Sequence, residues 1–190
     1  MISQTTSLPP RSSFPQLARR AATALALVSL TMCNLDHIDV SVGGKATIPK
    51  SSLLNTLLGD LSVAGFGGID FTQQFQNQGV SKGDVDAVNL KTFTLTVDAP
   101  AGGNFDFIQS IAFFAEASGA TKVQIASMDP VPKGKTSLTL TVDAGVDLTP
   151  YVVAPSMSIT SQVKGSAPSE DTTVDAEVVL DVNVHIPGCG

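Results

Sequence analysis

The chain has 190 residues and a formal net charge of −6, and all three arginines (Arg11, Arg19 and Arg20) lie near its N-terminus. A chain that begins at Cys33 therefore has no arginine, and its eight lysines against seventeen acidic residues give a formal charge of −9. Arginine is the usual residue for bidentate contacts with phosphates and base edges, and an acidic surface repels phosphate backbones. Composition therefore argues against nucleic-acid binding.

An apolar run of twelve residues, 21–32, follows the three arginines, and the first acidic residue is Asp36. A helix that spans a bilayer needs about 20 apolar residues, whereas a secretory signal needs a basic segment and roughly 7–15 apolar residues. We therefore expect residues 1–32 to be a signal peptide, residues 33–190 to form a single domain, and the protein to be exported. A mitochondrial transit peptide and a short buried helix of the domain are the alternatives.

The run ends in Leu30-Thr31-Met32-Cys33, which resembles the lipobox of bacterial exported lipoproteins. The resemblance implies that Cys33 becomes the lipid-modified first residue of a mature chain held in the cell envelope, with membrane attachment only through that lipid. Met32 stands where the family usually has Gly, Ala or Ser. Ordinary cleavage nearby, giving a periplasmic or extracellular protein, is therefore the alternative, with Cys33 as a thiol or half of a disulfide.

The first part of the expected domain is predicted to contain one strand and two short helices. Residues 37–42 (HIDVSV) alternate aliphatic and polar side chains, which predicts a half-buried strand. Residues 51–60 place four leucines at helical spacing, and Phe71 and Phe75, four apart, anchor a second short helix. These residues, with Phe66, form a candidate apolar mouth at one end of the domain, although the default interpretation is that they cap its core: Leu53, Leu54, Leu57, Leu58, Phe66, Phe71 and Phe75.

The remainder of the domain is predicted to be strands. Residues 93–97 (FTLTV) and 138–142 (LTLTV) alternate Thr with larger apolar residues, a combination that favours strands. Further strands are expected at 111–117, 122–127 and 157–163, and a β-bulge near Lys91 and Thr92, where the apolar phase changes. In residues 173–186 every even position is apolar, so even positions should be buried and odd positions exposed, except Val179. About seven strands with Gly- and Pro-rich connections predict an all-β antiparallel sandwich of immunoglobulin-like architecture with one or two short helices.

Part of the domain resembles a duplication. FTLTVDA at 93–99 matches LTLTVDA at 138–144, and each is followed by a ten-residue strand that ends in glycine, at 110–119 and 156–165. Two related three-strand units, completed by the N-terminal strand, would explain the match. Chance similarity between Thr-rich strands is the alternative.

The first and last strands are predicted to pair antiparallel, with residue numbers summing to 222. This register sets Ile38 opposite Val184 and His37 beside His185, and it directs Cys33 towards Cys189. A Cys33–Cys189 disulfide would exclude lipidation, because each uses the same sulfur. Parallel first and last strands are the alternative, and they would separate the two cysteines.

The sequence gives no catalytic constellation. Gly134-Lys135-Thr136 lacks the glycine that a phosphate-binding loop needs at position 129, and His37 and His185 occupy outward strand positions. A zinc site that joins these histidines to Cys33 and Cys189 would need ligands that stand about 13 Å apart along extended chain. We therefore expect no enzyme activity, metal or cofactor.

Two functions fit this pattern. The first is a non-enzymatic envelope protein that is tethered or secreted and binds another protein or a polysaccharide. The second is a carrier of an apolar ligand in the mouth of the sandwich.

Overall fold

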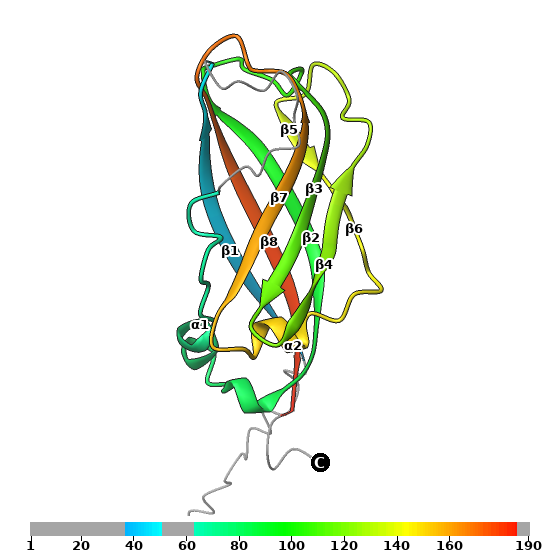
Figure 1. Ribbon diagram of the computed structural model, residues 1–190. Helices are drawn as coiled ribbons and strands as arrows, with labels where there is room; N and C mark the ends of the chain where they lie inside the picture. Colours follow the sequence, from blue (N-terminus) through cyan, green and yellow to red (C-terminus); the bar gives the residue numbers. More distant parts are fainter. Residues whose placement is uncertain (1–36, 51–62, 186–190) are drawn as a thin grey trace, which may run out of the picture. The chain divides into compact units, whose positions relative to one another are not determined.

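The computed structural model describes residues 37–50 and 63–185, which form a sandwich of two antiparallel sheets (Figure 1). Sheet A has the strand order β1-β8-β2-β5, and sheet B has the order β6-β4-β3-β7. The expected all-β sandwich is confirmed. The strands are β1 (His37–Ile48), β2 (Val85–Ala99), β3 (Ile108–Ala117), β4 (Ala120–Met128), β5 (Ser137–Thr139), β6 (Thr141–Val142), β7 (Met157–Gly165) and β8 (Thr172–Val184).

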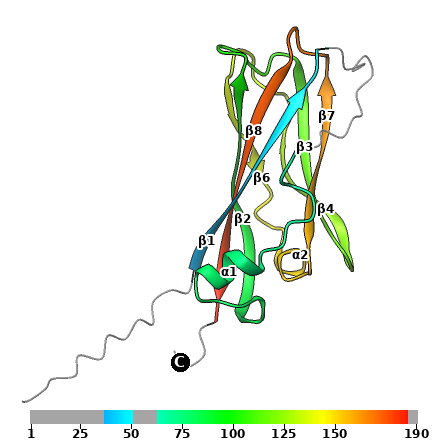
Figure 2. The same cartoon turned by 90° about the vertical axis from the view of Figure 1, so that its left-hand side faces the viewer.

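Helical structure in the described residues is limited to α1 (Thr72–Asn77), the 3-10 turn η2 (Lys82–Asp84) and α2 (Thr149–Val152), which lie at one end of the sandwich (Figures 1 and 2). The helix expected around Phe71 and Phe75 is confirmed as α1, whereas the expected helix in residues 51–60 lies outside the described residues. Within 37–50 and 63–185 no helix is long and apolar enough to cross a membrane.

Strand β8 lies between β1 and β2 and supplies the inner face of sheet A. Its even-numbered residues from Val174 to Val184 are all buried, as the period of two predicts. The odd-numbered residues are mostly half-buried rather than exposed, and only Glu177 among them is open to solvent. Neighbouring strands on both sides cover the outer face of a central strand, so polar residues there lose part of their contact with water.

The antiparallel pairing of β1 with β8 is confirmed, but the predicted register is wrong by two residues. His37 lies opposite Asn183 rather than His185, and Ile38 opposite Val182 rather than Val184. A shift of two residues leaves every side chain on its original face, so alternation alone does not distinguish the two registers. The observed register sets Lys45 opposite Asp175. The Lys45 Nζ lies 3.3 Å from the Asp175 Oδ1 and 2.8 Å from the Asp98 Oδ2.

Two predicted features of the central strands take a clear form in the structure. The pairing of β2 with β8 shifts register between Leu90 and Thr92, which confirms the predicted bulge. The predicted strand at 138–142 is divided at Leu140: β5 pairs with β2 in sheet A, and β6 pairs with β4 in sheet B. This segment therefore passes from one sheet to the other and closes that side of the sandwich.

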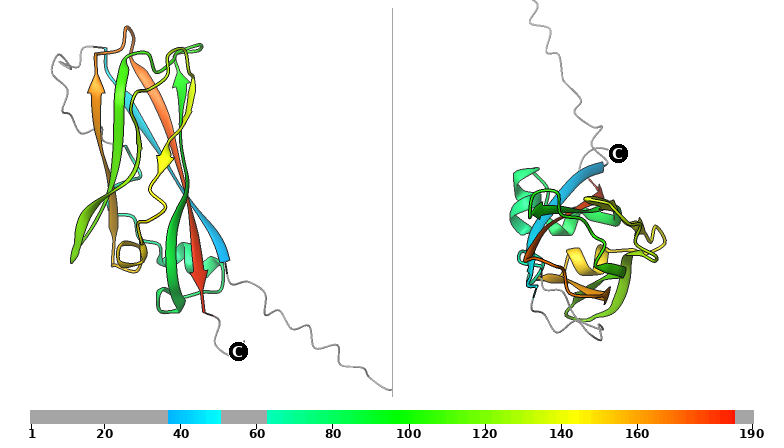
Figure 3. Two further views of the ribbon diagram at one scale, coloured as in Figure 1. Left: turned by 90° about the vertical axis from the view of Figure 1, so that its right-hand side faces the viewer. Right: turned by 90° about the horizontal axis from the view of Figure 1, so that it is seen from above.

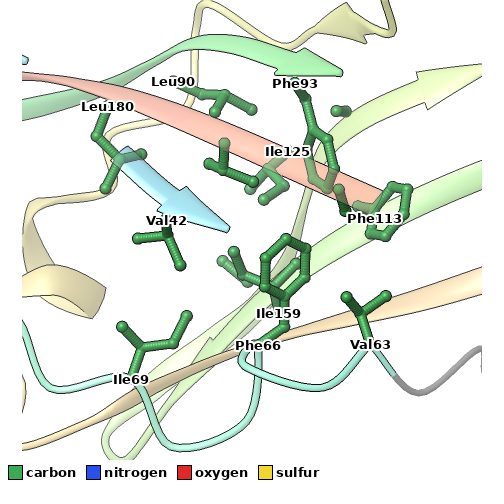
Figure 4. Packing of buried hydrophobic residues seen from close by; sticks show 14 of the residues in the cluster. Val42, Val63, Phe66, Ile69, Leu90, Phe93, Phe113, Ile125, Ile159 and Leu180 are labelled. Carbon is green, nitrogen blue, oxygen red and sulfur yellow. The ribbon is translucent and has the colours of Figure 1, made fainter. Parts of the chain in front are cut away.

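Residues 63–69, here named the strap, close the opposite side between β1 and β7. Lys45 and Ala64 exchange two backbone hydrogen bonds (3.1 and 2.7 Å), as do Ile69 and Met157 (2.7 and 2.9 Å). From the strap, Val63, Phe66 and Ile69 point into the core (Figure 4). With the divided β5–β6 segment on one side and the strap on the other, strands and strap enclose the core as a continuous ring, which Figure 3 shows from above.

The segments that resemble each other in sequence pair with each other in space. Thr94 lies opposite Thr139, its equivalent in the second copy, and Phe114 lies opposite Thr160, its equivalent in the following strand. Two antiparallel strands that lie side by side are related by a local twofold axis between them. The Thr94–Thr139 pair marks the position of this axis between β2 and β5, and the Phe114–Thr160 pair marks it between β3 and β7. Phe93 is next to Thr94, Phe113 is next to Phe114, and the centroids of these two rings are 4.2 Å apart. The two self-matching pairs therefore face each other across the core.

The third strands obey the same relation. Val97 of β2 pairs with Val174 of β8, and the equivalent Val142 of β6 pairs with Ala126 of β4. Among the strands that the structure describes, β1 has no counterpart, and neither the strap nor the short helical segments have one. Chance similarity between Thr-rich strands explains shared composition but not this shared pairing, so the structure favours duplication of a three-strand unit that β1 completes.

We expect Val178→Ala to lower the free energy of unfolding by about 2 kcal/mol, because Val178 is fully buried and its truncation leaves a cavity. Val179→Ala, the matched control on the outer face of the same strand, should cost at most about 1 kcal/mol. Urea denaturation of both variants measures the difference. Equal costs would contradict the assigned faces of β8.

A second pair of variants tests closure by the strap. A Cβ added at Gly44 would lie 2.5 Å from the Ala64 carbonyl oxygen and 2.7 Å from the Val63 Cγ1. We expect Gly44→Ala to destabilise the protein by about 1–3 kcal/mol, as overpacking does. At Gly43 the nearest atom would be 3.9 Å away, so Gly43→Ala should be neutral or slightly stabilising. If the two variants unfold at the same urea concentration, the strap does not lie against β1.

Candidate functional site

The residues assigned to an apolar mouth do not form one in the part that the structure describes. Phe66 and Phe71 are 1% exposed and Phe75 is fully buried. Phe66 makes an edge-to-face contact with Phe93, with ring centroids 5.9 Å apart, and Phe71 stacks with Phe75 at 6.1 Å. The three rings pack as core residues, in two separate places. Leu53, Leu54, Leu57 and Leu58 lie outside the described residues.

A polar cluster fastens α1 to the end of the sandwich. The Lys82 ammonium lies 2.8 Å from the Asp70 Oδ1 and donates a 2.6 Å hydrogen bond to the carbonyl oxygen of Ala154, just after α2. The same Asp70 oxygen accepts hydrogen bonds from the backbone N–H and the hydroxyl of Thr72. Lys82, followed by Thr72, holds the pKa of the Asp70 carboxyl well below its usual range. The cluster stabilises this end of the fold and leaves no open mouth beside Phe71.

The other predicted site residues give no shared site. Cys33 and Cys189 lie outside the described residues, so lipidation and the disulfide stay predictions. His37 is exposed, with its Nδ1 3.0 Å from the Asp181 Oδ1, and His185 donates its backbone N–H to the Asp84 carbonyl oxygen. In residues 37–50 and 63–185, no three His, Cys, Asp or Glu side chains gather where they would hold a metal ion.

A groove of about 240 Å³ lies on the outer face of sheet B. It is centred on Ala112 of β3, which pairs with Ser127 of β4 on one side and Gln162 of β7 on the other. Two residues further along β3, Phe114 lies opposite Gln124 and also lines the groove. The small methyl group of Ala112, between larger neighbours, explains why the sheet surface is hollow here.

The aromatic ring beside this groove is held in place from its other side. The Lys122 Nζ lies over the Phe114 ring, 5.0 Å from its centroid. Glu116 fixes that ammonium with a 2.6 Å ion pair and accepts a 2.7 Å hydrogen bond from the Thr160 hydroxyl. Lys122 first, and then Thr160, lowers the pKa of the Glu116 carboxyl, which therefore stays ionised near neutral pH. Phe114 is thus a half-buried ring in a fixed orientation.

Charges at the groove cancel. Asp129, just after β4, and Lys164, in β7, are its two charged lining residues, and Ser110 of β3 also lines it. The chain as a whole carries −6. The groove is therefore a locally neutral surface of hydroxyls, amides and one aromatic ring on an acidic protein.

A second hollow, of about 330 Å³, lies between residues 100–107 and 168–172. These loops are at the end of the sandwich away from α1 and α2 (Figure 1). Loop residues, including Pro100, Gly102 and Pro168, form most of its walls. Its charged lining residues, Asp106 and Glu170, are both acidic, and its aromatic lining residue, Phe107, lies in the loop before β3.

The sequence analysis did not identify the sheet B groove. The signal for it was present in the adjacent Phe113 and Phe114, because one of two neighbouring residues in a strand must face outward. Phe113 is fully buried, so Phe114 takes the outer face. Which residues of β4 and β7 surround it depends on strand order, which the sequence pattern does not specify.

Comparison with known proteins assigns no family: no protein-family model matches the chain, and no curated protein is significantly similar to it.

The Asp70 cluster generates a pH prediction. Because the pKa of Asp70 is depressed in the folded state, its stabilisation is complete above the unfolded value of about 4 and is lost as pH falls through the folded pKa. We expect Asp70→Asn to be less stable than the wild type at pH 6, with the difference shrinking as the pH falls below about 4. Urea denaturation between pH 6 and pH 2 measures it. Asp86→Asn, at an exposed carboxylate of β2, is the control, and a difference for Asp70→Asn that does not vary with pH would contradict the ion pair.

Proposed function

We propose that the chain is exported and serves as a non-enzymatic binding or structural protein of the cell envelope, attached to a membrane through lipid on Cys33 or released as a secreted protein. The observation that carries this proposal is the order of features along the chain. Three arginines, a twelve-residue apolar run and a lipobox-like cysteine precede a β-sandwich whose first described strand begins at His37. A short tether of this kind would place the sandwich close to the membrane surface.

The character of the domain supports a binding or structural role. Its core is filled by aliphatic and aromatic side chains from both sheets and the strap. The ion pairs of residues 37–50 and 63–185 lie mainly at the surface, on strands and at the α1 end. A rigid β-sandwich with surface grooves suits recognition more than chemistry.

A carrier of apolar ligands is the less favoured alternative. A carrier needs an apolar cavity of several hundred Å³ that receives the ligand. Phe66, Phe71 and Phe75, the described members of the candidate mouth, are almost fully buried against other side chains. Ligand entry there would require these rings to leave the core.

Fractionation of a bacterium that expresses the full chain tests the proposal. We expect the wild type in the membrane fraction, with residues 1–32 absent from its intact mass and acyl mass added. Cys33→Ala should move to the soluble exported fraction, because the lipid attachment point is lost. Cys189→Ala, the matched cysteine control, should fractionate as the wild type does.

Two results would count against parts of this proposal. A protein that retains Met1 and stays in the cytosol would overturn export. An exported chain without acyl mass, and with Cys33 joined to Cys189, would overturn the tether and leave the secreted form.

A further inference from the structure

We propose that the groove on the outer face of sheet B binds a neutral polysaccharide, with one sugar ring placed over Ala112 and against Phe114. This inference rests on the proposed envelope binding role and names the class of ligand that the role requires.

The shape of the groove fits a sugar ring beside an aromatic wall. Ala112 and Phe114 are two residues apart on β3, a step of roughly 7 Å along the strand, so the low and high points of the surface are neighbours. The row Ser127–Ala112–Gln162 forms the floor, and the row Gln124–Phe114–Thr160 rises beside it. The groove crosses three paired strands whose backbone is fixed by hydrogen bonds, so its shape is present before any ligand arrives.

The chemistry of the lining matches a ligand covered with hydroxyl groups. Ser110 and Ser127 each donate and accept hydrogen bonds, and so do the amides of Gln124 and Gln162. A sugar hydroxyl also donates and accepts, so each of these side chains pairs with it in either direction. The Phe114 ring supplies an apolar surface for the C–H face of a sugar.

The charge balance selects a neutral ligand. Asp129 and Lys164 carry one charge of each sign, so the groove has no net attraction for an anion or a cation. Nucleic acid would need several lysines or arginines at the contact. A protein partner would favour a more apolar centre with several aromatic residues and arginine, and this groove has one aromatic ring.

The support behind Phe114 prepares the ring for binding. Lys122 lies over it, Glu116 holds Lys122, and Thr160 donates to Glu116, so the ring is braced by a chain of three polar contacts. A side chain that is already ordered loses little conformational entropy when a ligand arrives.

Affinity electrophoresis of the purified exported protein tests the inference. The gels contain one of four neutral polysaccharides (xyloglucan, laminarin, galactomannan or dextran) or one anionic polysaccharide, alginate. We expect at least one neutral polysaccharide to retard the wild type and alginate to have no specific effect. Phe114→Ala should reduce the affinity at least tenfold, because it removes the stacking surface.

The control variants separate binding from folding. Val179→Ala, on the outer face of sheet A, should bind as the wild type does. If Phe114→Ala fails to fold, as judged by circular dichroism, the double variant Gln124→Ala/Gln162→Ala tests the same groove through two exposed side chains, and its affinity should also fall at least tenfold.

Three outcomes would overturn the inference: no retardation by any of the four neutral polysaccharides, retardation that both groove variants retain in full, or retardation by alginate alone. Failure here is distinguishable from failure of the proposed function. An exported protein that binds none of these polysaccharides leaves the envelope role standing, whereas a cytosolic protein removes that role whatever its groove binds.

Discussion

Burial of the inner face of β8 is the constraint on which the rest of the fold depends. Six alternate residues from Val174 to Val184 are buried, and every one of them needs apolar neighbours from sheet B. Flanking strands β1 and β2 extend this apolar surface, and sheet B covers it with β3, β4 and β7. Two sheets alone leave the sides of such a core open. The division of the strand at Leu140 closes one side, and the strap closes the other.

The two closures differ in origin. The β5–β6 segment belongs to the repeated unit, since its partner across the local twofold axis is β2 itself. By contrast, the strap occupies a position that the repeat does not supply, between β1 and β7. If the two copies were arranged symmetrically, β8 would lie beside β7, as β4 lies beside β3. In the observed fold β1 lies between β8 and β7, and the strap joins β1 to β7. The asymmetry explains why Gly44 has no side chain, because the strap backbone needs the space.

The terminal glycines of the repeated strands show how one sequence feature serves two purposes. Gly119 has φ of 82°, which a two-residue turn between β3 and β4 requires, because residues other than glycine rarely adopt it. Gly165 instead lies where the backbone of Phe107 leaves no room for a Cβ. Equivalent positions therefore keep glycine for different physical reasons, as expected when the following connections have diverged.

Local alternation was enough to predict the strands and their buried faces, but long-range choices were not predictable from it. The phase of β8 and the bulge near Lys91 follow from single-strand patterns, and both are confirmed. The register of β1 on β8 was wrong by two residues, because a shift of two residues leaves every side chain on its original face and alternation treats the two registers as equal. Phe66 was assigned to a candidate mouth with Phe71 and Phe75, whereas backbone pairing of the strap with two strands carries it into the core.

The outer faces of the two sheets differ in a way that bears on function. On sheet A, Lys91 lies 2.7 Å from the Asp39 Oδ2, and Lys45 lies between Asp98 and Asp175, so both lysines of that face are already paired. Exposed ion pairs of this kind contribute little to stability, but they satisfy charges that a partner would otherwise contact. On sheet B Gln124 and Gln162 are exposed beside a braced aromatic ring, and the Gln124 Nε2 donates one long hydrogen bond, 3.4 Å, to the Ser127 hydroxyl. On sheet B a ligand that brings hydroxyl groups would compete with this long hydrogen bond, whereas on sheet A it would have to displace ion pairs. Since both sheets share one filled core, this difference in surface chemistry is what supports the proposal that sheet B is the recognition face.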